Sequence, residues 1–205
     1  SDKKVWVTGV TEFSTFGPFG DPCNVVGHTT LTGDLNCVAL MIMSTSASLD
    51  TAGYDVQVGD TISAYGNLNV TGGSAVNVGG TASVYASGGT TNTTLNISGG
   101  SSFTTCILDG DASTLVQIDG ASTLKFSDST TCLSDAGILS NADFELNITG
   151  SEGSMATITT NASGVPANAY WNFEAVSLTV NAEYVNLSYY DTAMIGNLNI
   201  NNSNF

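Results

Sequence analysis

The residues best suited to chemistry are a close pair of carboxylates, Asp109 and Asp111, and a single histidine, His28. Paired carboxylates can act as general acid and general base in sugar hydrolysis, and a histidine beside an activated serine can act as a base. The chain has no Arg, however, and Lys125 is its only Lys beyond Lys4. It has no Gly-x-Ser-x-Gly motif either. Because Asp-Gly-Asp is also common in turns, we expect no catalytic residue, and a polysaccharide lyase or hydrolase is the most remote function considered.

Acidic residues could also bind a metal ion, because Ca²⁺ is held by clustered oxygen ligands. The thirteen Asp residues are scattered along the chain, and the Gly-Gly-x-Gly-x-Asp calcium repeat is absent. Solvated turns explain such residues better. We expect no metal site and no bound cofactor, with Ca²⁺ as the alternative.

Covalent N-glycans are a further expectation. Asn-x-Ser/Thr sequons occur at Asn69, Asn92, Asn96, Asn147, Asn161, Asn186 and Asn201. A chain this rich in Asn, Ser and Thr would contain about five by chance, so their number carries no weight. Their positions are more informative, because Asn161 and Asn201 lie at expected turns, and Asn96 lies between Leu95 and Ile97, where it should face outward. We expect several to carry glycans in a host that has the machinery.

The four cysteines favour disulfide bonds. Cys23, Cys37, Cys106 and Cys132 form an even set in a Ser/Thr/Asn/Gly-rich chain, without the Cys-x-x-Cys spacing of a zinc site. Of the three connectivities, Cys23–Cys37 with Cys106–Cys132 closes two short loops. The alternative is four buried free thiols. Disulfides would place the protein in an oxidising compartment, secreted or at the cell surface.

The elements that would position these residues repeat at about twenty residues. Apolar-polar-apolar triplets recur at Val56–Val58, Val76–Val78, Leu95–Ile97, Val116–Ile118, Leu178–Val180 and Leu198–Ile200. Turn residues follow most of them, and a column of small residues follows the turns: Thr61, Thr81, Ser101, Ala121, Ala142, Ala162 and Ala182. A fixed period of this length is typical of stacked-repeat architectures. It predicts an all-β parallel β-solenoid with rungs of about twenty residues.

An antiparallel jelly-roll sandwich is the alternative fold, because two strands of such a sandwich also take about twenty residues. A sandwich has no reason to repeat residue types at a period of twenty rather than ten. The expected disulfides fit a strict solenoid register poorly, since Cys132 lies several positions beyond the rung position of Cys106. Both folds therefore stay open, with the solenoid favoured.

The stretch from Thr61 to Gly120, with its phrases NLNVTGGSAVNVGG and TTLNISGG, resembles the parallel β-helix repeats of secreted haemagglutinin-type adhesins. The resemblance covers about two thirds of the chain. It rests on the general composition of the repeats rather than on a specific motif, and it assigns no functional residue. It implies an exported, surface-exposed or fibrous protein.

Composition excludes two classes of partner. With 18 acidic residues against three Lys, the formal net charge is -15. Nucleic-acid binding needs Lys and Arg to displace counterions from phosphates, and attraction to anionic membranes needs the same residues. No apolar stretch is long enough to span a bilayer, so we expect no membrane insertion. The start at Ser1 is consistent with a processed, exported protein.

The two ends of the repeat suggest assembly. Residues 1–20 are expected to form a separate strand or cap, with Val5, Trp6, Val7 and Val10 as an extended segment, and residues 21–205 a single repeat domain. Leu198 and Ile200 lie in an expected strand near the other end. Exposed strand edges can pair with another chain. We therefore expect a structural subunit of an extracellular filament or surface layer that binds copies of itself, residues 1–20 being donated to a neighbour or capping their own domain.

A monomeric surface adhesin that binds a glycan is the alternative function. Tyr65 and Tyr85 are twenty residues apart and should stack on each other. Tyr170, Trp171, Tyr184, Tyr189 and Tyr190 gather in the C-terminal part of the sequence. Exposed aromatic rings can stack on sugars or on a partner subunit, although core packing explains them equally well.

Overall fold

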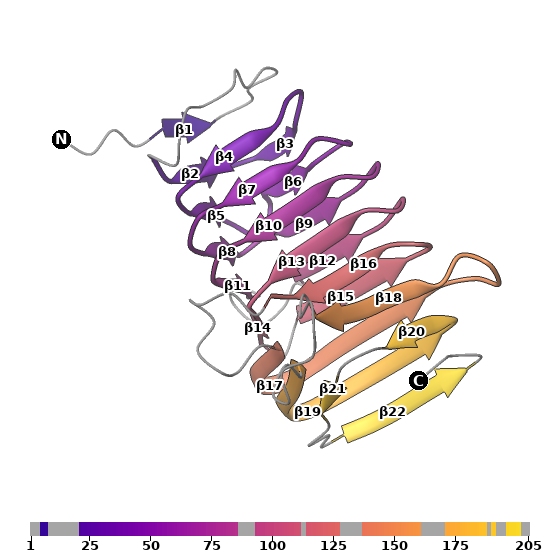
Figure 1. Ribbon diagram of the computed structural model, residues 1–205. Coiled ribbons are helices and arrows are strands. Elements are labelled where there is room, and N and C mark those ends of the chain that lie inside the picture. Colours follow the sequence, from indigo (N-terminus) through magenta and orange to yellow (C-terminus); the bar gives the residue numbers. More distant parts are fainter. Residues whose placement is uncertain are drawn as a thin grey trace.

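The computed structural model of the chain is an all-β stack of rungs (Figure 1). It describes residues 5–7, 21–85, 93–111, 114–127, 137–160, 171–187, 190–191 and 196–201. No helix occurs among these residues, and every pairing between their strands is parallel. The predicted β-solenoid is confirmed, and the antiparallel jelly-roll alternative is wrong.

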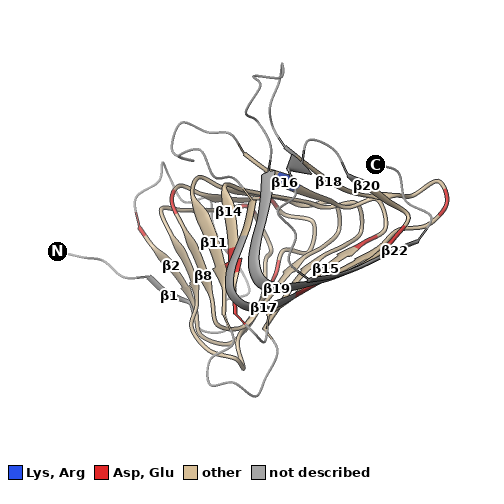
Figure 2. Ribbon diagram, turned by 90° about the horizontal axis from the view of Figure 1, so that it is seen from below, with Lys and Arg blue, Asp and Glu red and all other residues tan. Residues whose placement is uncertain are grey.

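The stack has three faces, each a parallel sheet whose neighbouring strands belong to successive rungs (Figure 2). The first face contains β2 (Cys23–Val25), β5 (Leu40–Ile42), β8 (Ile62–Ala64), β11 (Thr81–Val84) and β14 (Ile107–Gly110). The second contains β3 (His28–Thr30), β6 (Ser48–Asp50), β9 (Asn67–Val70), β12 (Thr93–Ile97) and β15 (Thr114–Asp119). The third contains β4 (Leu35–Cys37), β7 (Val56–Val58), β10 (Ala75–Val78), β13 (Ser102–Thr105), β16 (Thr123–Phe126), β18 (Ala156–Thr160) and β20 (Val185–Leu187).

Two long strands join the first face to the second. The first half of β17 (Gly137–Thr149) pairs with β14 and its second half with β15, while β19 (Trp171–Glu183) pairs along both halves of β17. Two shorter strands, β21 (Tyr190–Asp191) and β22 (Gly196–Asn201), pair with β19. At the opposite end, β1 (Val5–Val7) pairs with β2 of the same chain.

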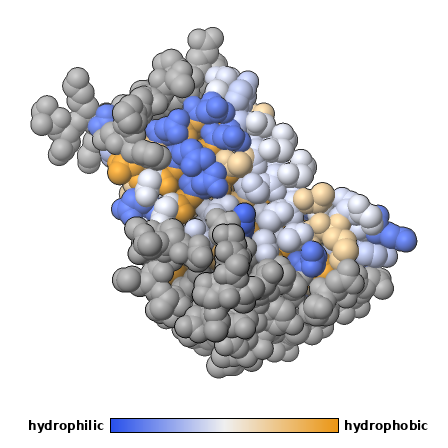
Figure 3. All heavy atoms as spheres, in the orientation of Figure 1, coloured by the Kyte–Doolittle hydropathy of each residue, from blue (hydrophilic) through white to orange (hydrophobic). Residues whose placement is uncertain are grey.

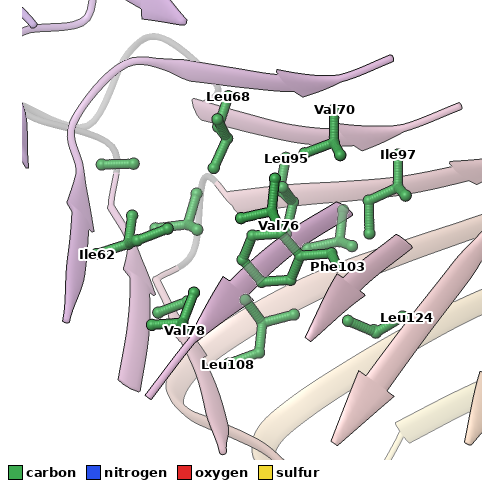
Figure 4. Packing of buried hydrophobic residues seen from close by; sticks show 14 of the residues in the cluster. Ile62, Leu68, Val70, Val76, Val78, Leu95, Ile97, Phe103, Leu108 and Leu124 are labelled. Atoms are coloured by element: carbon green, nitrogen blue, oxygen red, sulfur yellow. The ribbon is translucent and has the colours of Figure 1, made fainter. Parts of the chain in front are cut away.

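The core is a set of apolar columns, with at least one on each face. Alternation along each strand sends every second side chain inward, and the inward residues of successive rungs stack directly on one another (Figure 4). On the third face this column runs Val56, Val76, Phe103, Leu124 and Ile158, each with no exposed surface. Burial of such columns is the main source of stability in a stacked repeat.

The chain turns with the same backbone conformation at three corners between the second and third faces. Two consecutive residues have positive φ in the turns at Ala52-Gly53, Gly72-Gly73 and Gly99-Gly100. Glycine is favoured at Gly72 for a second reason, because a Cβ there would lie 2.9 Å from the backbone nitrogen of Gly53 in the preceding rung. Successive turns therefore stack closely.

A ladder of buried hydroxyls ties these turns together. The N–H of Gly53 donates to Ser74 Oγ at 3.1 Å, that of Gly73 to Ser101 Oγ at 3.1 Å, and that of Gly100 to Ser122 Oγ at 3.2 Å. We call Ser74, Ser101 and Ser122 the serine ladder; all three are buried. The N–H of Gly53 also donates to the Thr71 carbonyl at 3.0 Å, whereas Ser101 and Ser122 supply the acceptors for Gly73 and Gly100.

The disulfide Cys23–Cys37 is present, with Cα atoms 5.8 Å apart. Cys23 opens β2 and Cys37 ends β4, so the bond closes the first rung upon itself. Cys106 is also disulfide-bonded, and no described cysteine is a free thiol. Its expected partner, Cys132, lies outside the described residues.

The fixed period of twenty residues holds only for the early rungs. Hydrogen bonds between successive rungs join residues 20 apart at Thr51 and Thr71, 28 apart at Gly73 and Ser101, and 34 apart at Asn147 and Asn181. In the sequence, the longer intervals fall between β11 and β12, between β16 and β17, and between β18 and β19. Segments that connect paired strands tolerate differences in length.

The predicted columns are consequently wrong beyond the first rungs. Val56 and Val76 stack on the third face as expected, but Leu95 pairs with Leu68 and Val116 on the second face. Likewise Thr81 pairs with Ile107 rather than with Ser101. The triplets share an alternating pattern, but they belong to two different faces.

Candidate functional site

The carboxylate pair proposed for chemistry is divided between two structural roles. Asp109 faces outward on β14 and accepts a short hydrogen bond from the Tyr85 hydroxyl. Asp111 belongs to the turn that leads into β15, where its carboxylate accepts a hydrogen bond from Thr114 Oγ1 at 3.2 Å. Asp111 N–H in turn donates to Thr114 Oγ1 at 2.9 Å.

Tyr85 lies between Asp109 and Tyr65. The rings of Tyr65 and Tyr85 are 6.2 Å apart between centroids and inclined by 37°, so the predicted stacking of these residues is confirmed. Partial burial raises the pKa of Tyr85 above 10.0, and the hydrogen bond to the Asp109 carboxylate raises it further. This hydroxyl therefore keeps its proton and acts as a hydrogen-bond donor.

Other aspartates bind backbone groups. Asp34 Oδ1 accepts from the N–H of Asp55 at 3.0 Å, and Asp55 Oδ1 accepts from the N–H of Ala75 at 2.8 Å. Asp50 Oδ1 accepts from the N–H of Ala52 at 3.0 Å. These carboxylates satisfy donors at the corners of the next rung or of their own turn, in agreement with the turn role expected from the sequence.

His28 lies beside a serine on the second face. Its Nδ1 is 2.8 Å from Ser48 Oγ, across the neighbouring strands β3 and β6. The N–H of Ser48 donates to the carbonyl of Gly27, so it cannot also serve an oxyanion. The contact links two rungs on an exposed sheet surface.

The sequons occupy dissimilar environments. Asn186 is exposed on β20, whereas Asn69, Asn96 and Asn147 are half-buried on the second face. Asn96 faces outward as predicted, but its Oδ1 is buried without a hydrogen-bond partner. Asn92 and Asn161 lie outside the described residues, and Asn201 ends β22.

A column of amides runs along the outside of the second face. The register aligns Asn69, Asn96, Gln117, Asn147 and Asn181 on successive strands. We call these five residues the amide column. Within it, Asn181 Nδ2 donates to Asn147 Oδ1 at 2.8 Å. This bond runs along the stack, in the same direction as the backbone hydrogen bonds between the strands of successive rungs.

The surface is hollowed where this column crosses β15, β17 and β19. A shallow groove of about 310 Å³ is lined by Gln117, Asn147, Thr149, Asn181 and Glu183, with Ile148 and Ala182 below. We call it the amide groove. Asp119 lies at its edge, where both carboxylate oxygens accept from Gln117 Nε2 at 3.2 and 3.0 Å.

The amide groove is not predicted from the sequence, although the sequence contains a pattern of Asn and Gln residues that points to it. The polar residue at the centre of several triplets is an Asn or Gln, and two of these residues, Asn96 and Gln117, belong to the amide column. Recognising the column requires the register between rungs, which the unequal corner lengths conceal.

Part of the described surface is apolar. Figure 3 shows an apolar patch among hydrophilic residues near the N-terminal strands. On β5 and its flanks, Val38, Met41 and Met43 are exposed by 37–39%. Lys125 is the only Lys or Arg among the described residues (Figure 2).

The described part of the chain is a three-sided parallel β-solenoid with one polar groove on its flank. Comparison with protein-family models, curated proteins and solved structures finds no match for this chain. Within the described ranges, no three His, Cys, Asp or Glu side chains gather as a metal site would require. No helix in that part of the chain is long and apolar enough to cross a membrane.

Proposed function

We propose that this chain is a structural subunit that associates head to tail, through the strand edges at the two ends of its solenoid, into an extracellular filament or surface layer. The observation that carries the proposal is that the outermost described strands pair on one side only. At one end β3 pairs with β6 and β4 with β7; at the other, β20 pairs with β18 and β22 with β19.

The two ends are complementary in direction. Because all strands of a face are parallel, the last strand of one copy can pair with the first strand of the next without a change of direction. Such a contact uses different surfaces on the two copies, so it does not close into a dimer and continues as a filament. Open edges of this kind are ready templates for pairing.

The backbone of β4 shows which groups are available for such pairing. The Leu35 N–H donates to the Asp55 carbonyl, and the Cys37 carbonyl accepts from Gly59. The N–H and carbonyl of the intervening Asn36 therefore point away from β7, toward the open edge.

The N-terminal strand β1 lies at the same end of the solenoid as β3 and β4. β1 carries Val5, Trp6 and Val7 and pairs with β2, and no described strand pairs with the outer edge of β3 or β4. Donation of this strand to a neighbouring copy, the form of assembly expected from the sequence, would exchange the β1–β2 pairing between chains. At the opposite end, Leu198 and Ile200 belong to β22. Val10 lies outside the described residues.

An extracellular setting is part of the proposal. The Cys23–Cys37 disulfide is stable in oxidising compartments. A glycan on the exposed Asn186 would project from the third face rather than from the ends of the stack. Glycosylation and end-to-end assembly are therefore compatible.

Electron microscopy of the non-reduced protein tests this function. We expect filaments with an axial repeat of about 40 Å, because eight strands of the second face are spaced at ~4.8 Å. Asn36→Pro removes the outward N–H of β4 and should abolish them, whereas Asn36→Ala keeps that N–H and should assemble normally. Discrete particles of the unmodified chain at high concentration would overturn the proposal.

A further inference from the structure

We propose that the amide groove binds a linear neutral oligosaccharide that lies along the stack. This site is independent of end-to-end assembly, because it occupies the flank of the solenoid and the proposed contacts occupy its ends. Three features carry the inference: the alignment of the lining groups, their fixed orientation and the sign of the local charge.

The lining groups form two adjacent rows along the stack. Gln117, Asn147 and Asn181 pair in register on β15, β17 and β19, and Asp119, Thr149 and Glu183 form the row two residues further along. Successive members of a row are ~4.8 Å apart, the spacing of neighbouring strands. One pyranose ring has a comparable length, so a linear sugar chain parallel to the rows would meet a similar set of groups at each rung.

Hydrogen bonds hold the amides in place before any ligand arrives. Gln117 Nε2 donates to the Asp119 carboxylate, Asn147 Nδ2 donates to Glu145 Oε1 at 3.1 Å, and Asn181 Nδ2 donates to Asn147 Oδ1. Fixed side chains lose little conformational freedom on binding. A primary amide has two N–H donors and a carbonyl acceptor, so Gln117 and Asn147 can still bind a ligand.

The chemistry of the groove matches hydroxyl groups. Amides both donate and accept, the Glu183 carboxylate accepts, and the Thr149 hydroxyl does either; both of the latter side chains are exposed. A sugar hydroxyl also donates and accepts, so it can pair with every group in the groove. An apolar ligand would leave these groups unpaired.

Charge selects among polyhydroxylated ligands. Glu145, Asp119 and Glu183 surround the groove, and the single described cation, Lys125, lies on β16 of the third face. The whole chain carries a formal charge of -15. Sulfated and uronic-acid polymers are therefore repelled, and a neutral glycan is the compatible occupant.

Isothermal titration calorimetry with cellohexaose, mannohexaose and xylohexaose tests the site. We expect saturable binding of at least one hexasaccharide, weakened at least tenfold by Asn147→Ala with Asn181→Ala. Asn77→Ala is the matched control, because Asn77 is an outward-facing amide on β10 of the third face. It should bind as the unmodified chain does.

A second variant guards against loss of folding. Glu183→Gln retains the shape of an exposed side chain and should weaken binding severalfold while circular dichroism stays unchanged. Absence of binding for all three sugars, equal loss in Asn77→Ala, or binding only of oligogalacturonate or of spermidine would each overturn the proposal. None of these results depends on whether filaments form.

Discussion

The Thr29 hydroxyl is buried in β3 with no hydrogen-bond partner, at a position where the paired residue of β6 is Leu49. An unpaired buried hydroxyl costs roughly 1–3 kcal/mol, so Thr29→Val should raise the free energy of unfolding by about 1 kcal/mol. Urea titration of the non-reduced protein measures this change.

Thr51→Val is the opposing control. The Thr51 hydroxyl donates to the Thr71 carbonyl and accepts from the Thr71 N–H at 2.9 Å. Replacing Thr51 by Val should therefore lower the free energy of unfolding by about 1–3 kcal/mol. If both variants were destabilised equally, the Thr29 hydroxyl would have a partner after all.

Tyr85 gives the fold a specific sensitivity to alkali. Its pKa is raised in the folded state by burial and by the Asp109 hydrogen bond, so folding favours the protonated phenol. The resulting stabilisation is complete below pH 10.0, the unfolded value, and is lost as the pH rises through the higher folded pKa. Relative to Tyr85→Phe, the unmodified chain should lose stability above about pH 10.

Thermal unfolding of the two proteins at matched pH values tests this difference, and comparison at each pH cancels general alkaline damage. Tyr54→Phe serves as the control, because Tyr54 is exposed on a turn and its replacement should leave the pH profile unchanged. A constant difference between the unmodified chain and Tyr85→Phe across the range would contradict the prediction.

At the scale of elements, the serine ladder should fix the geometry of the turns. Ser101→Ala leaves the N–H of Gly73 without its acceptor and should destabilise by about 1–3 kcal/mol. Ser102→Ala, at the adjacent outward-facing position, should change stability by less than about 0.5 kcal/mol. Urea titration measures both changes, and equal effects would mean that the ladder does not stabilise the turn.

The sequence predicts the elements better than their register. The repeat of about twenty residues correctly indicates stacked parallel strands, and alternation within the triplets correctly places apolar residues inside. Short spacing correctly pairs Cys23 with Cys37. The stretch between Tyr85 and Thr93 carries no periodic signal, yet its length decides which strands become neighbours. The amide groove depends on two other long intervals, between β16 and β17 and between β18 and β19, because these align Gln117 with Asn147 and Asn147 with Asn181. A fixed period of twenty residues does not predict that alignment.

At the scale of the whole molecule, charge should control assembly. Each copy carries -15, so copies repel one another, and salt shortens the range of that repulsion from ~10 Å at about 0.1 M to ~3 Å at about 1 M. Head-to-tail association should therefore strengthen with NaCl. Sedimentation velocity should show larger species as salt rises, while Asn36→Pro stays monomeric throughout; association that weakens with salt would indicate contacts between unlike charges.

The disulfide that closes the first rung has a mechanical consequence. Hydrogen bonds between rungs run along the stack, so a pull on its two ends loads each bond along its own length and separates the rungs one after another. A rung of about twenty residues then releases up to ~70 Å of chain. The Cys23–Cys37 bond spans 14 residues and therefore withholds up to ~50 Å of that length from the first rung. Under tension the solenoid should extend in steps while its first rung remains a closed loop, and reduction should make that loop extensible.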